Sequence, residues 1–99
     1  MSYSDTIVVA AGQTKYVPLR VKELNRITGS FSVEGGNNDV NFWVADPFNN
    51  VVVQSKTVTR NQEVALVAAT AGEYRLYFDN SYSWVTNKVV KYSVTLYWR

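Results

Sequence analysis

The residue types that most often carry catalysis are missing from this chain. Its 99 residues include no His and no Cys, so the commonest general base and metal ligand, and the softest nucleophile, are absent. Ser and Thr are present, but the sequence places no base beside them. We therefore predict that the protein is not an enzyme and that it holds no cofactor.

Three carboxylates lie next to turn-forming residues, namely Asp39, Asp46 and Asp79. Side chains of this length hydrogen-bond backbone groups a few residues away, so their expected role is to hold loops. The alternative is a shared Ca²⁺ site at one end of the fold, because calcium takes roughly six to eight oxygen ligands. Asn37 and Asn38 would supply some of those ligands. No ligand spacing that we know supports this alternative, so we expect no metal.

The aromatic residues divide into two groups by their position along alternating segments. One group falls among the apolar positions and is expected in the core: Phe31, Phe42, Tyr74, Phe78 and Tyr92. The other group falls on the opposite faces of its segments: Tyr16, Trp43, Tyr77 and Tyr97. The second group either packs against Lys and Arg stems on an ordinary surface or forms a protein-binding face, since Tyr and Trp dominate interface anchors. Aromatic platforms also suit sugars, which keeps a carbohydrate-binding module as the alternative function.

The elements that must position these residues are short strands. Apolar and polar residues alternate with a period of two, typical of strands with one buried face. The expected strands cover residues 6–10, 15–22, 26–34, 39–45, 51–56, 62–69, 73–78 and 90–98. The Ala and Leu content of 62–69 also suits a helix, but its neighbours favour a strand. We predict one all-β domain over residues 1–99, an antiparallel, jelly-roll-like β-sandwich of about eight strands.

Proline and glycine punctuate this pattern. Pro18 removes a backbone donor, which predicts an edge or bulged strand. Gly29 predicts a bulge or a close backbone approach. Residues 35–38 (Gly-Gly-Asn-Asn) are expected to form a hairpin loop, and Asp46-Pro47 predicts a turn.

The least generic stretch runs from Gly72 to Trp84. Its alternation stops at a polar loop whose motif residues are Asp79, Asn80, Ser81, Tyr82 and Ser83. We expect Asp79 and Asn80 to bond the loop backbone rather than a ligand, because short polar side chains satisfy groups that lack ladder partners. Tyr82 and Trp84 would then fold back over the end of the core.

This stretch resembles the GOLD (Golgi dynamics) domain. The residues that carry the resemblance are Gly72, Tyr74, Phe78-Asp79-Asn80-Ser81-Tyr82-Ser83 and Lys88-Val89. In the family, the Lys-Val pair opens the last strand. The resemblance implies a compact β-sandwich. It also implies cargo or adaptor binding in membrane traffic, because members occur in transmembrane receptors of COP-coated vesicles, Sec14-like proteins and Golgi adaptors.

The net charge and the targeting signals bear on which classes of partner and which cellular locations we expect. The net charge is +2 with scattered basic residues, which favours a solvated surface over a nucleic-acid footprint. We expect a protein partner, leave a homodimer open, and expect neither nucleic acid nor direct membrane insertion. The resemblance implies the secretory pathway or Golgi. Tyr77 stands where vesicle cargo receptors usually carry Cys, and the sequence shows no sequon, signal peptide or membrane span, which leaves a cytosolic or prokaryotic location open.

Overall fold

The protein is a two-layered sandwich of β-sheets. The computed structural model describes residues 2–22, 25–34, 39–59, 61–68, 70–81 and 87–97. These residues form eight strands and no helix, so none of them forms a helix that crosses a membrane. The strands are β1 (Ser2–Val9), β2 (Thr14–Val21), β3 (Arg26–Glu34), β4 (Asp39–Ala45), β5 (Val51–Thr59), β6 (Asn61–Val67), β7 (Gly72–Asp79) and β8 (Lys88–Tyr97).

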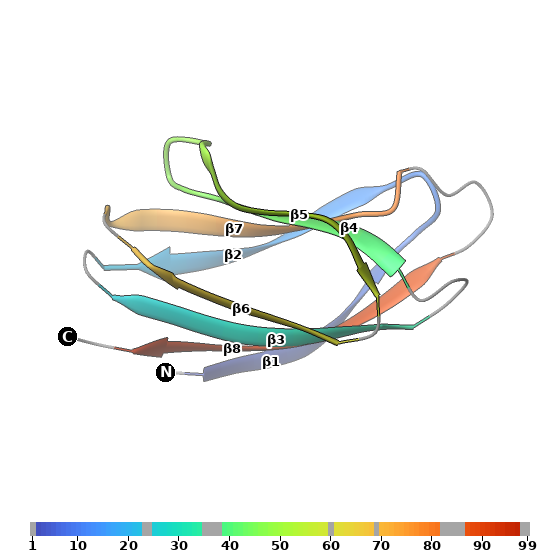
Figure 1. The fold of residues 1–99 in the computed structure, drawn as a ribbon, viewed down its shortest axis with the longest axis horizontal. Helices are drawn as coiled ribbons and strands as arrows, with labels where there is room; N and C mark the ends of the chain where they lie inside the picture. Colours follow the sequence, from blue (N-terminus) through green and yellow to red (C-terminus); the bar gives the residue numbers. More distant parts are fainter. Residues whose placement is uncertain are drawn as a thin grey trace.

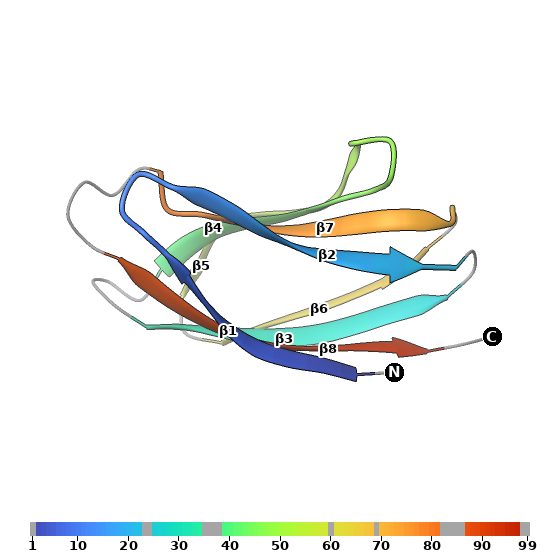
Figure 2. The same cartoon turned by 180° about the vertical axis from the view of Figure 1, so that it is seen from behind.

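The strands divide equally between two antiparallel sheets. One sheet has the order β1-β8-β3-β6 and the other has the order β2-β7-β4-β5. Figure 1 shows them as two layers, and Figure 2 shows the side where β1 and β2 are joined. Most successive strands change sheet, and such winding is typical of jelly rolls. The predicted antiparallel sandwich of about eight strands is confirmed, and 62–69 falls on strand β6.

The hairpin predicted at residues 35–38 is wrong. Strand β3 pairs with β6 and β8, whereas β4 pairs with β5 and β7, so the chain crosses between sheets here. The residues of the connection lie outside the described ranges. Gly and Asn suit any tight change of direction, so their presence indicates a turn without indicating which strands it joins.

The core lies between the sheets and is filled by the inward residue of each alternating pair. Phe31 from one sheet meets Phe42 and Phe78 from the other, with ring centroids 4.5 Å and 5.1 Å away. Tyr74 is buried as predicted, and Tyr92 is half-buried against the same cluster. The period-2 pattern therefore predicted the buried faces correctly, because one face of every strand must leave water.

Pro18 and Gly29 have separate explanations. Pro18 lies on β2, an edge strand of its sheet, where a missing N–H is tolerated. At Gly29 the register with both neighbouring strands is regular, so no bulge forms. A Cβ at Gly29 would lie 3.2 Å from the Ser93 carbonyl oxygen and 3.3 Å from Val94 Cγ2. The second of the two expectations for Gly29, a close approach, is therefore correct.

The turn between β4 and β5 is held by its own first residue. Asp46 Oδ1 accepts hydrogen bonds from the backbone N–H groups of Phe48 and Asn50, at 2.9 Å and 2.8 Å. Asn49 takes a φ of 67°, a left-handed conformation that Asn tolerates. Asp46 thus has the loop-holding role expected of it, and the turn presents Phe48 to solvent with 70% of its surface exposed.

Candidate binding face and the loop beside it

Three of the four outward aromatics form one row across the β2-β7-β4-β5 sheet. Tyr16 of β2 lies opposite Tyr77 of β7, which lies opposite Trp43 of β4. The Tyr16 and Tyr77 rings are 5.4 Å apart and tilted, and the Trp43 and Tyr77 rings are 5.0 Å apart and stacked within 14°. We call these three residues the aromatic strip. Cross-strand aromatic neighbours of this kind support each other's orientation.

Arg75 completes the strip on the same face of β7. Its guanidinium carbon lies 4.8 Å from the centroid of the Tyr16 ring, and its Nη1 donates to the Tyr77 hydroxyl at 3.4 Å. Its Nε donates to Glu73 Oε2 at 2.9 Å. The bonds to Tyr77 and Glu73 raise the pKa of Arg75 further above its ordinary value. The guanidinium therefore stays charged and stays beside the strip.

The rings of the strip are held in place by their neighbours on the sheet. Tyr16 is 44% exposed, while Tyr77 and Trp43 are half-buried by their neighbours. Rigid aromatic rings with few rotatable bonds lose little conformational freedom on binding. Tyr, Trp and Arg are also the residue types that dominate interface energetics. The chemistry available here is apolar contact with hydroxyl and guanidinium hydrogen bonding, rather than proton or group transfer.

Tyr97 does not belong to this face. It lies on β8, opposite Arg26 of β3, in the other sheet, and is 51% exposed. Alternation predicted that each of the four aromatics points away from the core, but it carries no information on which sheet a strand joins. Sequence reasoning also passed over Arg75 as a functional residue, although it stands two positions before Tyr77, on the same face of a strand.

The loop motif begins with Asp79, at the end of β7. Its Oδ1 accepts hydrogen bonds from Thr14 Oγ1 at 2.7 Å and from the Ser81 backbone N–H at 2.9 Å. Partial burial acts to raise the pKa of Asp79, but the hydrogen bonds from Ser81, Thr14 and Asn41 outweigh it, so the pKa lies below its ordinary value. These partners are all groups of the protein, which agrees with a loop-holding role.

Asn80 is fully buried and connects β7 to the turn between β1 and β2. Its Nδ2 donates to the Val9 carbonyl at 3.0 Å, and its backbone N–H donates to the Gln13 carbonyl at 2.8 Å. Its own carbonyl accepts from the Gly12 N–H at 3.1 Å. A buried side chain engaged in this way is out of reach of a ligand in solvent, which agrees with the structural role predicted for Asn80.

The remaining motif residues are only partly described. Ser81 is exposed and donates its N–H to Asp79. Tyr82, Ser83 and Trp84 lie outside the described residues.

The three carboxylates Asp39, Asp46 and Asp79 do not gather at one end of the sandwich, as the calcium alternative requires, because strand β4 separates Asp46 from the other two. Asp39 begins that strand and Asp46 follows its end, so a strand of about 20 Å separates them. Asp79 lies near the start of β4, because it is opposite Asn41. Within the described ranges, no three His, Cys, Asp or Glu residues are grouped to hold a metal ion.

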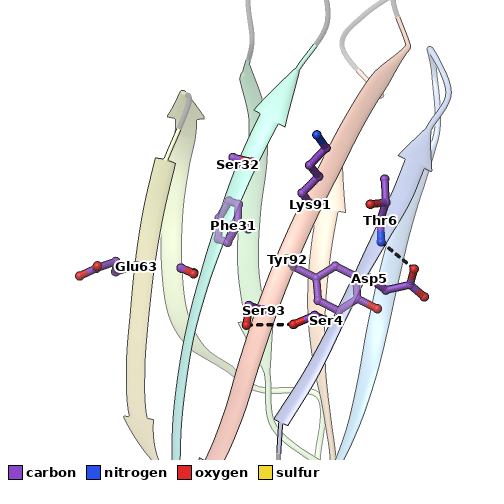
Figure 3. Close-up of a pocket in the computed structure, with 10 residues that line it drawn as sticks. Ser4, Asp5, Thr6, Phe31, Ser32, Glu63, Lys91, Tyr92 and Ser93 are labelled. Atoms are coloured by element: carbon purple, nitrogen blue, oxygen red, sulfur yellow. Dashed lines mark hydrogen bonds between the residues drawn. The ribbon is translucent and has the colours of Figure 1, made fainter.

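The outer face of the other sheet is polar and hollowed (Figure 3). A shallow cavity of about 650 Å³ there includes Ser4, Ser30, Ser93, Glu63 and Lys91 in its lining. Ser4 Oγ donates to Ser93 Oγ at 3.1 Å. The hollow forms because the residues of its floor are small, and longer charged side chains stand beside them. It could accept a polar ligand through hydroxyl, carboxylate and ammonium groups.

Comparison with known proteins gives a family and a fold relative. A family model described as "emp24/gp25L/p24 family/GOLD" matches residues 5–97. Among solved structures, Aeromonas hydrophila PliG, described as a periplasmic lysozyme inhibitor of g-type lysozyme, aligns with a TM-score of 0.66 and 16% identity, covering 96% of this chain and 85% of that one. A family two carbohydrate esterase from Cellvibrio japonicus aligns with a TM-score of 0.32 and 13% identity, covering 99% and 35%. No curated protein sequence matches. At its low identity, the PliG match shows a shared fold alone.

Proposed function

Because the chain belongs to the emp24/gp25L/p24 family, whose GOLD domain model it matches, we propose that it is a non-catalytic domain that binds other proteins through the aromatic strip. The family is one of trafficking domains without catalytic activity. For this chain the corresponding role is to hold a cargo or adaptor protein in the secretory pathway. The observation that carries the proposal is the continuous row of Tyr16, Tyr77 and Trp43 with Arg75 beside it.

The strip has the properties of an interface anchor. Stacking fixes the Trp43 and Tyr77 rings before any partner arrives, which lowers the entropy lost on binding. Arg75 supplies donors in a fixed fork that a partner's carboxylate or backbone carbonyl can accept. Contacts made by large aromatics and Arg near the centre of an interface typically dominate its affinity.

The test is a pair of truncations with a control from the other sheet. A partner is isolated with the purified domain and its affinity is then measured by calorimetry for the wild type, Trp43→Ala, Tyr77→Ala and Tyr97→Ala. We expect each strip variant to weaken binding by at least about tenfold, the usual effect of losing an aromatic anchor. Tyr97→Ala should bind as the wild type does, since Tyr97 is an exposed aromatic residue that lies on the opposite face.

If both strip variants bind the partner with unchanged affinity, the aromatic strip is not the binding face. Far-UV circular dichroism of each variant establishes that it is folded. An additional loss of binding in Tyr97→Ala would mean that the partner contacts the other sheet, and would also contradict the proposal.

Carbohydrate binding is a second candidate, and the polar hollow of Figure 3 favours it. Sugar hydroxyls pair well with a mixture of donors and acceptors such as Ser30, Ser93 and Glu63. The aromatic rings in the lining of the hollow, Phe31 and Tyr92, pack in or against the core, however. The rings of the aromatic strip all lie on the outer face of the opposite sheet. Titration of ¹⁵N-labelled protein with an oligosaccharide panel separates the candidates. Saturable shifts at Ser30 and Ser93 would favour sugar binding at the hollow and would count against the protein-binding assignment.

A further inference from the structure

The sandwich has four edge strands, β1, β2, β5 and β6, and they differ in how open each is to pairing with another chain. Strand β2 carries Pro18 together with exposed Lys15 and Arg20, features that discourage pairing with another chain. Strand β5 shifts register twice along β4, and such irregularities also blunt an edge. Strand β6 contains no Pro, Lys or Arg and pairs with β3 in an unbroken register, but it contacts β5 of the other sheet. Strand β1 contains no Pro, Lys or Arg, and it pairs with β8 in one unbroken register from Ser2 to Val9.

Side-chain hydrogen bonds fix β1 against β8. Ser4 Oγ donates to Ser93 Oγ at 3.1 Å, and the Ser2 and Thr95 hydroxyls are 3.2 Å apart. Side chains approach this closely across pairs that do not exchange backbone hydrogen bonds. The backbone N–H and C=O groups of Ser2, Ser4, Thr6 and Val8 therefore point away from β8, toward the free edge. Strand β1 thus presents a row of backbone donors and acceptors in regular register.

One of these edge donors is already occupied. The Thr6 N–H donates to Asp5 Oδ1 at 2.7 Å, as drawn in Figure 3. Asp5 is exposed and belongs to the inward side of β1, together with Tyr3, Ile7 and Val9, because it lies opposite Tyr92. An inward-pointing charge on an edge strand is a known obstacle to strand addition. In β1 this charge is the Asp5 carboxylate. It obstructs pairing by accepting the hydrogen bond from the Thr6 N–H at the middle of the strand.

We propose that the free edge of β1 pairs antiparallel with β1 of a second copy of this chain, and that Asp5, by occupying the Thr6 N–H, holds this pairing weak. Residues directly opposite each other in a sheet must share a face. With Thr6 opposite Thr6 of the second copy, Ser4 lies opposite Val8, Asp5 opposite Ile7 and Tyr3 opposite Val9. The pairing requires the Asp5 carboxylate to rotate away from the Thr6 N–H.

The sequence of β1 suits its own second copy in this register. Thr–Thr and aromatic–β-branched cross-strand pairs are favourable, and Thr6–Thr6 and Tyr3–Val9 are such pairs. The two carboxylates are kept apart, whereas a shift by one register step would place Asp5 directly opposite Asp5, which is unfavourable. Seven residues of each strand pair, with about six backbone hydrogen bonds. The contact is two-fold and uses the β1 edge of each copy. No β1 edge is left for a third copy, so assembly stops at a dimer.

The experiment measures self-association by sedimentation velocity over a wide concentration range. We expect the wild type to dimerise only at high concentration, and Asp5→Ala to dimerise with a dissociation constant at least about tenfold lower. Asp5 is exposed and its carboxylate accepts a hydrogen bond from within β1, so the substitution leaves the core intact. In the double variant Asp5→Ala/Thr6→Pro the dimer should be lost without unfolding, because an edge strand tolerates a missing outward N–H.

Cross-linking tests the register directly, because the chain contains no native Cys. In the Asp5→Ala background, Thr6→Cys should form an intermolecular disulfide on oxidation, since paired Cα atoms about 5.5 Å apart are within disulfide reach. Ser4→Cys should not, because the two Ser4 positions lie well beyond about 7 Å in this register. The proposal is overturned if Asp5→Ala associates no more strongly than the wild type, or if Ser4→Cys cross-links as readily as Thr6→Cys. It does not depend on the aromatic strip, so it and the proposed function fail separately.

Discussion

Strand β7 is used in two different ways along its length. Gly72, its first residue, lies against Pro47. Asn80, the residue directly after its end, is buried against the turn between β1 and β2. In its middle, Arg75 and Tyr77 face outward. Among the residues that the structure describes, their side chains contact other residues of the same outer face. The ends tie β7 to the rest of the fold, whereas the middle carries the surface that we assign to binding.

This difference shows that one short motif combines two separate requirements. The end residues are restricted by steric fit and buried hydrogen bonds, so they tolerate few substitutions. The outward residues are restricted by what they present to solvent, so they should tolerate substitution without loss of fold. Stability and affinity should therefore respond to different positions of the same strand.

The largest loss of stability is expected at Gly72. Its φ is 141°, and a Cβ there would lie 2.7 Å from Pro47 Cγ. Gly72→Ala combines backbone strain with overpacking, so we expect a loss of about 2–4 kcal/mol of unfolding free energy. Chemical denaturation followed by fluorescence measures it.

Gly12 provides the matched control for this substitution. It also has a positive φ, 80°, but a Cβ there would have no atom within 4 Å. Gly12→Ala should therefore lose only the backbone part of the cost, about 1–2 kcal/mol. If the two variants are equally stable, the contact with Pro47 is not what requires glycine at position 72.

A smaller loss is expected at Asn80. Asn80→Ala removes the buried hydrogen bond to the Val9 carbonyl and should lower the free energy of unfolding by about 2 kcal/mol. Asn87 offers a comparison in the same region, because its Oδ1 accepts from the Ala11 N–H at an exposed site. Asn87→Ala should cost clearly less, since water can replace that bond. Equal costs for the two variants would contradict the argument from burial.

The inward faces of the strands followed from the sequence alone. Every strand must present one face to the core, and a period of two marks that face in Phe31, Phe42 and Phe78 without knowledge of the partners. The family motif likewise identified the loop that begins at Asp79 and the start of β8 at Lys88. These features depend on short stretches of chain, which is why a single sequence is enough to predict them.

The pairing of distant segments could not be predicted in this way. Nothing in the alternation around Tyr97 indicates that β8 joins the sheet opposite to β7. The contact of Pro47 with Gly72 and the bond from Thr14 to Asp79 each join residues far apart in sequence. Such contacts depend on strand order and register, which tertiary packing decides.

The outward middle of β7 should matter much less for stability than its ends. Tyr77→Ala removes two ring contacts and the hydroxyl that accepts from Arg75, on a half-exposed face. We expect a loss of about 1 kcal/mol, measured by the same denaturation assay. If Tyr77→Ala destabilises the protein as much as Asn80→Ala does, the aromatic strip is required for folding, and the division of β7 into two uses is wrong.

The smallest effect is a pH dependence at Asp79, where the end of β7 meets solvent. Its pKa lies below the ordinary value of 3.8 in the folded protein, because hydrogen bonds from Ser81, Thr14 and Asn41 outweigh the effect of burial. A carboxylate with a lowered folded pKa binds protons more readily in the unfolded chain, so its contribution to stability is fully present above the unfolded pKa.

As the pH falls below about 4, and on through the folded pKa, that contribution is lost. The stability advantage of the wild type over Asp79→Asn should therefore shrink across this range. Thr14→Val removes one of the stabilising hydrogen bonds, so NMR titration of the Asp79 carboxyl carbon in this variant should give a higher pKa than in the wild type. A pKa that stays the same after Thr14→Val would mean that the Thr14 hydroxyl does not stabilise the carboxylate, and that Ser81 and Asn41 alone account for the lowered pKa.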